Sequence, residues 1–266
     1  MDLSGQTAVV TGASRGIGRA IAMELASCGA NVALWSRRAD DVAAVADDLA
    51  PDAPGRIAAR GVDVRKRQQI DAAVRAAADL APVTLLVNNA GTAGPAGLDW
   101  EADPHEWWQC VETSLLGSFL CEQAIVPGML ERGSGRVVEI VSVTGTTAFP
   151  LLGATSVAKA ALIRHAENFA VATADTGVSV FGLHPGTVDT ELLASYRSNP
   201  QVAAFFDGMP PDSFTPPQVA ARAAARIATG ELDALSGCFV DATADLDALA
   251  GDDGESAGRQ LRLRLA

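Results

Sequence analysis

Three glycines near the start of the chain, Gly12, Gly16 and Gly18, have the residue type and spacing of a phosphate-binding turn. A residue without a Cβ permits a tight turn and lets the backbone approach a pyrophosphate closely. The spacing is Gly-x-x-x-Gly-x-Gly, which is longer between the first two glycines than the standard dinucleotide fingerprint. The turn therefore predicts a dinucleotide site, although similar turns also join strands to helices where no ligand binds.

The segments on both sides of this turn must supply a strand and a helix if the interpretation is to hold. Residues 7–10 form an apolar run that predicts a buried strand, and residues 17–26 have the apolar spacing of a helix. The start of such a helix offers free N–H groups and a partial positive charge to the phosphates.

Strand and helix signals continue to alternate along the chain. We expect strands at residues 31–35, 56–64, 83–87, 136–142, 178–183 and 237–241. We expect helices at residues 40–49, 68–78, 107–127, 155–173 and 217–229. This order predicts an α/β, doubly wound Rossmann fold with a mainly parallel sheet and three αβα layers. We assign residues 1–245 to one nucleotide-binding domain and residues 246–266 to an appended C-terminal tail.

Composition limits the function further. The chain has 266 residues, 48% of them hydrophobic, and a formal net charge of −12, which argues against nucleic acid and anionic membranes as partners. It contains neither an uninterrupted apolar span nor an opening signal-like segment. The cysteines and histidines are scattered, which favours reduced thiols in a cytoplasmic protein and no metal site: Cys28, Cys110, Cys121, Cys238, His105, His165 and His184.

The end of the second expected strand bears on the choice of cofactor. NAD-specific sites place an acid there for the ribose 2′-hydroxyl. This strand instead continues into Ser36 and Arg37, and Arg15 lies in the glycine turn. Arginine suits a 2′-phosphate because its planar fork donates two parallel hydrogen bonds. The pattern favours NADP over NAD, the alternative being two ordinary surface arginines.

Several further segments carry a resemblance to a known family. They are Thr11–Gly18, Asp63-Val64, Asn88-Asn89-Ala90-Gly91, Ser142, Lys159-Ala160-Ala161-Leu162 and Pro185-Gly186-Thr187-Val188-Asp189-Thr190. In this order and at these distances they resemble the short-chain dehydrogenase/reductase family, over about residues 3–240. The resemblance implies a nicotinamide dinucleotide cofactor and a small-molecule substrate.

The resemblance also implies roles for individual residues. Asp63 and Val64 would flank the adenine, Lys159 would hold the nicotinamide ribose, and Val188 and Thr190 would meet the carboxamide. The residues expected to bind the cofactor are Gly12, Ser14, Arg15, Gly16, Ile17, Gly18, Ser36, Arg37, Asp63, Val64, Asn89, Ala90, Gly91, Lys159, Pro185, Gly186, Val188 and Thr190.

The expected catalytic group departs from the family at two positions. Typical members use a serine, a tyrosine, a lysine and an asparagine. Ser142 and Lys159 match, but Thr155 stands in the place of the tyrosine and Ser114 in that of the asparagine. A phenol titrates near pH ~10, whereas an aliphatic hydroxyl is a much weaker acid. General acid catalysis contributes about 10²–10⁴ in rate, and Thr155 as a direct substitute would lose most of it.

Three functions therefore stay open. The first is an NADP-preferring oxidoreductase acting on a carbonyl or alcohol of a small, partly apolar molecule. The second is non-redox chemistry in the same cleft, namely dehydration, cyclisation or isomerisation. The third is a catalytically weak nucleotide-binding protein. The helices around Leu115 and Val157 are apolar on more than one face, which predicts burial on more than one side. The resemblance implies that these two helices pair across a two-fold axis, in a homodimer or homotetramer.

Two residues receive structural interpretations. Tyr196 is the only tyrosine and lies in an expected lid at residues 191–214, where we interpret it as a packing residue, the alternative being that it swings into the site and supplies the proton. Glu139 lies within an expected central strand, and a buried carboxylate is costly unless it is paired. We therefore interpret it as lying at a solvent-connected end of that strand, the alternative being a proton relay behind Ser142.

Overall fold

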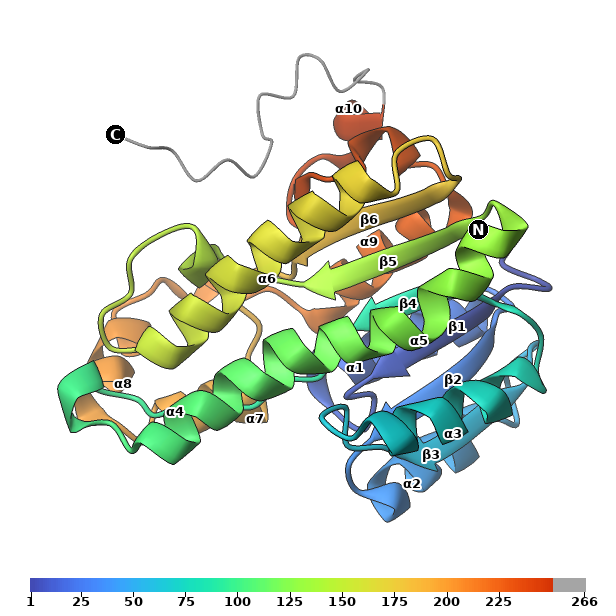
Figure 1. Ribbon diagram of the computed structural model, residues 1–266. Helices are drawn as coiled ribbons and strands as arrows, with labels where there is room; N and C mark the ends of the chain where they lie inside the picture. Colours follow the sequence, from blue (N-terminus) through green and yellow to red (C-terminus); the bar gives the residue numbers. More distant parts are fainter. Residues whose placement is uncertain (251–266) are drawn as a thin grey trace.

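A seven-stranded parallel sheet forms the centre of the computed structural model, which describes residues 1–250 (Figure 1). The strands are β1 Thr7–Thr11, β2 Asn31–Ser36, β3 Ile57–Gly61, β4 Val83–Asn88, β5 Gly135–Ile140, β6 Val178–His184 and β7 Phe239–Asp241. Their order is β3-β2-β1-β4-β5-β6-β7, and every neighbouring pair runs parallel.

Helices cover both faces of this sheet. Helices α1 (Gly16–Ser27), α2 (Ala39–Leu49) and α9 (Pro217–Thr229) pack on one face. Helices α3 (Arg67–Ala78), α5 (Gly117–Arg132) and α6 (Gly153–Ala172) pack on the other. The strands are therefore buried on both sides, which explains their continuous apolar runs. The predicted doubly wound αβα fold is confirmed. Within residues 1–250, no helix combines the length and the apolar character that crossing a bilayer requires.

The strand order reverses between β1 and β4, which opens a crevice at the carboxyl ends of the strands. Three short helices lie beyond this edge, on the side to which the strand arrows point in Figure 1. They are α4 (Pro104–Val111), α7 (Glu191–Tyr196) and α8 (Pro200–Asp207). These helices and the loops around them lie where a ligand can meet several strand ends at once.

The long helix expected at residues 107–127 differs from its prediction. It is α4, a π-helical turn at Glu112–Leu116, and then α5, which ends at Arg132 before Gly133 at φ 62°. The expected end near Pro127 is wrong. Pro127 is exposed, so water can solvate the carbonyl group that its missing N–H leaves unpaired. The buried face continues beyond it at Met129, and this packing extends the helix.

Residues 246–250 contact the body of the protein. They form α10 (Leu246–Ala250), and Leu246 joins the hydrophobic cluster under α1 and α9. The Arg226 guanidinium lies 2.8 Å from an Asp247 carboxylate oxygen. The start of the expected tail therefore packs against the body, while the rest of it, residues 251–266, lies outside the described residues.

The glycine turn explains a close approach between α1 and two strand ends. Gly12 and Gly16 have φ values of 65° and 55°, which side chains with a Cβ rarely adopt. A Cβ on Gly18 would lie 2.5 Å from the Gly12 carbonyl oxygen and closer still to the Asn89 amide. Gly18 therefore allows α1 to pack directly on the turn that precedes it.

We predict that Gly18→Ala destabilises the protein by about 1–3 kcal/mol, because the added methyl group must displace backbone. Gly128→Ala is the matched control in another helix. Its Cβ would meet only the flexible end of Arg132, at 3.2 Å, so we expect a gain of about 0.5–1 kcal/mol. Urea unfolding of both variants measures the difference, and equal effects would contradict this account of Gly18.

Candidate active site and nucleotide cleft

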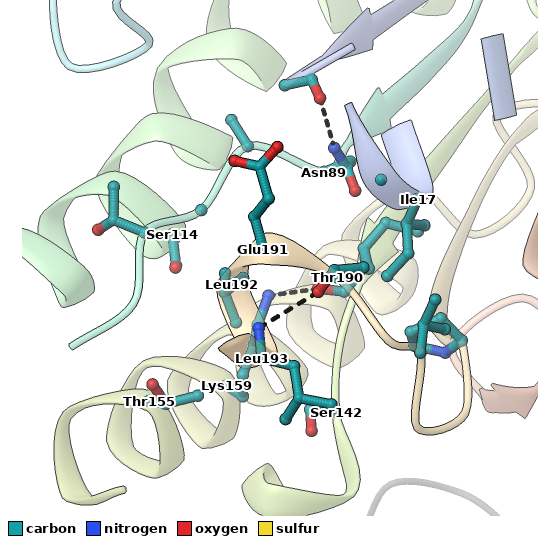
Figure 2. Close-up of a pocket in the computed structure, with 18 of the residues that line it drawn as sticks. Ile17, Asn89, Ser114, Ser142, Thr155, Lys159, Thr190, Glu191, Leu192 and Leu193 are labelled. Carbon is teal, nitrogen blue, oxygen red and sulfur yellow. Dashed lines mark hydrogen bonds between the residues drawn. The ribbon is translucent and has the colours of Figure 1, made fainter. Parts of the chain in front are cut away.

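One continuous cavity of about 950 Å³ lies at the carboxyl edge of the sheet. Its size falls within the roughly 300–1,000 Å³ that ligand pockets usually have. Every residue predicted for cofactor binding or catalysis lines it except Gly18 and Asp63. Figure 2 shows Thr155 and Lys159 on one helix and Ser114 on another, with Ser142, Asn89 and Thr190 around the same space.

One end of the cavity has the features of a phosphate site. Arg15, Gly16 and Ile17 line it at the start of α1, where no side chain caps the free backbone N–H groups. The Ser36 hydroxyl, at the end of β2, donates to the Ser14 hydroxyl at 3.1 Å. Arg37 and Arg38 line the same end, and Arg38 pairs with Asp41. An uncapped helix start with nearby arginines fits an anionic nucleotide.

Asn89 ties the glycine turn to the end of β4. Its amide nitrogen donates to the carbonyl oxygens of Thr11 at 2.8 Å and Gly12 at 3.2 Å. The Thr11 hydroxyl in turn accepts from the backbone N–H groups of Asn89 at 3.0 Å and Ala90 at 2.9 Å. Asn89 therefore holds two strand ends together as well as lining the cavity.

Two predicted cofactor residues lie outside the cavity lining for different reasons. Gly18 packs α1 against the turn, as described above. The Asp63 carboxylate pairs with Arg65 at 2.7 Å, which holds the pKa of that carboxyl below its usual range. Its neighbours Val62 and Val64 line the cavity instead.

The middle of the cavity contains the hydroxyls and the lysine. Ser142 follows β5, and its oxygen accepts from the Thr144 N–H at 3.2 Å and from the Thr144 hydroxyl at 3.1 Å. Its own proton is thus free to point at a ligand. The Lys159 ammonium donates to the Ile140 carbonyl oxygen at 2.5 Å, and burial lowers the pKa of this lysine. Ser114 is buried in the π-helical turn, a local deformation often found at functional sites.

Thr155 has an unexpected partner. Its hydroxyl oxygen lies 2.5 Å from the phenolic oxygen of Tyr196, which α7 brings across the cavity from the other side. The Cys110 thiol lies 3.7 Å from the same Thr155 oxygen. Tyr196 is only 4% exposed and lines the cavity. Burial raises the pKa of Tyr196 to about 12, although the Thr155 hydrogen bond acts in the opposite direction.

The far end of the cavity is apolar and largely aromatic. Side chains from the loop before α6 and from α8 form this wall: Phe149, Leu152, Phe205, Phe206 and Met209. The rings of Phe149 and Phe205 meet edge to face with centroids 4.8 Å apart. The Arg197 guanidinium lies 5.8 Å from the Phe206 ring centre and 5.3 Å from the Phe214 ring centre, which anchors the segment after α7.

Glu139 is completely buried, so its interpretation as a solvent-connected strand end is wrong. One of its carboxylate oxygens accepts from the Asn88 amide at 2.5 Å, and the other has no partner within the described residues. Burial raises the pKa of Glu139 well above its ordinary value, and the nearby Glu122 carboxyl raises it further. Burial also raises the pKa of Glu122 to about 7. Helix α5 covers the strand here, and the carboxyl has no route to water.

Sequence reasoning missed part of the cavity. Tyr196 and Glu191 were placed in a lid without a partner, and Phe149, Leu152 and Cys110 had no assigned role. No local pattern marks these residues, because each reaches the cavity through tertiary packing. The sequence offered one signal for Tyr196. It is the only tyrosine of a chain that has Thr155 where the family has a tyrosine.

Comparison with known proteins agrees with this architecture. The family model for short chain dehydrogenases matches residues 6–201, most of the described chain. The fold, the glycine turn and the cavity define a doubly wound α/β protein with a ligand-sized cleft at the carboxyl edge of its sheet, and the match specifies its family. The chain belongs to the short chain dehydrogenase family.

Individual relatives are moderately similar. The chain is 37% identical over 195 residues to a short chain dehydrogenase of Pseudocercospora fijiensis, covering 72% of this chain and only 62% of the relative. It is 32% identical over 191 residues to a 2-dehydro-3-deoxy-L-rhamnonate dehydrogenase (NAD(+)) of Sphingomonas sp. strain SKA58, covering 71% and 75%. A solved structure of an actinorhodin polyketide ketoreductase variant with NADPH superposes with a TM-score of 0.82, at 27% identity, covering 95% and 100%.

We predict that stability falls as pH rises from about 5 to 8. Glu139 and Glu122 keep protons in the native state that an unfolded glutamate, with a pKa near ~4.3, releases. The native state therefore binds more protons, and each such proton lowers the unfolding free energy by up to about 1.4 kcal/mol per pH unit. Glu139→Gln keeps a neutral group there, so its urea-unfolding stability should vary less with pH. Exposed Glu131→Gln is the control, and an unchanged pH slope in Glu139→Gln would contradict the assignment.

Proposed function

We propose that this protein is an NADP-preferring oxidoreductase acting on a carbonyl or alcohol of a small, partly apolar molecule. The observation that carries the proposal is the continuity of the cavity, which joins a phosphate site, a set of hydroxyls with a lysine, and an aromatic wall. A nicotinamide dinucleotide lying along this cavity would supply or accept a hydride.

The residues of the chain bind and orient both reactants in this proposal. The start of α1 and Ser14 hold the pyrophosphate, and Lys159, anchored on the Ile140 carbonyl, holds the ribose. The free hydroxyl proton of Ser142 forms a hydrogen bond to the substrate oxygen. The aromatic wall takes the apolar part of the substrate and excludes water from the reacting atoms.

The names of the relatives support carbonyl or alcohol chemistry, but the relatives differ in whether they use NADP or NAD. One is named as a ketoreductase and was solved with NADPH, whereas another is named as an NAD(+) enzyme. In this chain, Arg15, Arg37 and Arg38 gather at the cavity end, and no acid follows β2. This arrangement favours the 2′-phosphate of NADP. We also propose a cytoplasmic location. It is consistent with the four cysteines, which form no disulfide.

We also propose that two copies pair through α5 and α6. Several large apolar side chains on these helices face outward, among them Phe119 at 43% and Val157 at 47% exposure. They lie on the sheet face opposite α1 and α9. Large apolar side chains exposed on neighbouring helices are typical of a subunit interface.

We predict that NADP binds more tightly than NAD, and that Arg37→Asp removes the preference. The added carboxylate repels the 2′-phosphate, so NADP affinity should fall at least about tenfold, or about 1.4 kcal/mol. Quenching of intrinsic tryptophan fluorescence gives both affinities, because Trp35 lies in β2 two residues before Arg37.

Arg75→Asp serves as the control, since Arg75 is exposed on α3 and does not line the cavity. It should leave both affinities unchanged. Equal affinities of the wild type for NADP and NAD would contradict the cofactor proposal.

We predict a dimer or a larger oligomer in sedimentation at micromolar concentration, and Val157→Glu should shift it towards the monomer. A buried unpaired carboxylate opposes association, whereas the apolar face favours it. Met23→Glu changes a similarly exposed apolar residue on α1, on the other face of the sheet, and should not alter the mass. A monomeric wild type would rule out this interface.

A further inference from the structure

Helix α7 spans the cavity and is held at both ends. At its start, Glu191 pairs with Arg15 of the glycine turn. At its end, the Tyr196 phenol meets the Thr155 hydroxyl of α6 at 2.5 Å. Thr190 caps the helix by accepting from the Leu193 N–H at 3.3 Å (Figure 2). These contacts place a phenolic oxygen beside the residue that occupies the place of the family's tyrosine.

We propose that Tyr196 is the proton donor of this enzyme, delivered by α7 and oriented by Thr155. The inference rests on the proposed redox function. In this proposal the phenol comes from α7, which follows β6 in the chain, and not from α6. Thr155 then acts as a positioning residue and not as an acid.

The geometry favours Tyr196 over the other hydroxyls of the cavity. A phenol is a far stronger acid than the alcohols of Thr155, Ser142 and Ser114. Ser142 accepts two hydrogen bonds from Thr144 and can hold a substrate oxygen, but its alkoxide is inaccessible at working pH. Tyr196 alone combines an acidic hydroxyl, a place in the cavity lining and a fixed hydrogen-bond partner.

The surroundings of the ring keep the phenol in one position. Tyr196 packs in a cluster with Leu152, Leu193, Val202 and Phe206, and almost no part of it reaches solvent. A catalytic group must be held by its neighbours to transfer a proton efficiently. The same cluster forms the aromatic wall, so the phenol lies at the boundary between the polar and apolar parts of the cavity.

The protonation state of Tyr196 determines whether the site favours carbonyl reduction or alcohol oxidation. In reduction, the carbonyl carbon gains a hydride with its electron pair, and the carbonyl oxygen takes the Tyr196 proton. The phenolic O–H bond breaks, Thr155 donates a hydrogen bond to the phenolate, and solvent later returns a proton. Because burial raises the pKa of Tyr196 to about 12, the phenol stays protonated at neutral pH. The site is therefore suited to reduction, and oxidation should require alkaline pH.

The first experiment compares turnover with binding. Tyr196→Phe keeps the ring and its packing but removes the proton. We expect kcat for NADPH-dependent reduction of 4-nitrobenzaldehyde to fall about 10²–10⁴-fold, with NADPH affinity by tryptophan fluorescence unchanged. Ser195→Ala removes an exposed hydroxyl from the same helix and should leave both values unchanged. Oxidation of the matching benzylic alcohol should rise steadily with pH, and Thr155→Val should move that profile to higher pH.

The second experiment uses no turnover. Tyr196 is the only tyrosine of the chain, so the near-ultraviolet absorbance of tyrosinate reports its ionisation alone. Saturating NADP⁺ should lower the pKa of Tyr196, because the positive nicotinamide ring would share its cavity. Adenosine 2′,5′-bisphosphate occupies the nucleotide end without that ring and should not lower it.

The outcomes separate this inference from the proposed function. A wild type that binds neither dinucleotide or reduces no carbonyl of a broad panel would overturn the proposed function, and this inference with it. An active wild type with an equally active Tyr196→Phe would overturn the inference alone. So would a tyrosinate titration that responds identically to NADP⁺ and to the bisphosphate.

Discussion

The contact between the ends of β1 and β4 is the constraint on which the rest of the site depends. At this point the strand order reverses, and neither helix layer covers the strand ends. Asn89 and Thr11 exchange hydrogen bonds across it, while the missing Cβ of Gly18 lets α1 approach the same turn. A displacement of either strand would move the uncapped start of α1. The start of α1, where the proposed cofactor would place its phosphates, is therefore fixed to the ends of two central strands.

The second half of the cavity is built differently. Its residues come from α6, which packs on the sheet, and from α7, α8 and the loop before α6, whose apolar side chains form a separate hydrophobic cluster. The isolated bridges Gly97 to Leu152 and Thr187 to Phe214 join these segments in pairs. A wall made of such segments can change its shape without disturbing the core. This division explains how a site can retain the family's nucleotide end and still lose the family's tyrosine and asparagine.

Features that depend on local sequence pattern were predicted correctly. Strand positions, the glycine turn and the strand-end residues follow from apolar runs and from the types of residue that follow them, so their bounds agree to within a few residues. The predicted helix end at Pro127 is wrong because a local rule ends a helix that tertiary packing continues. The predicted exposure of Glu139 is wrong because the cost of burying a carboxylate favours solvent, whereas the protein holds the group buried beside Asn88. The Tyr196 to Thr155 contact could not be predicted, since it joins residues 41 positions apart through a helix whose direction only the folded chain determines.

The position of α7 links the two halves of the cavity physically. Arg15, which lies where a dinucleotide phosphate would bind, pairs with Glu191 at the start of α7, and Tyr196 ends the same six-residue helix. Both partners of that ion pair are exposed, so the pair contributes little to stability and can exchange for a phosphate at small cost. At the other end of the helix, the aromatic cluster and the Thr155 hydrogen bond hold Tyr196. An anion can therefore replace Glu191 on Arg15 while the phenol stays in place.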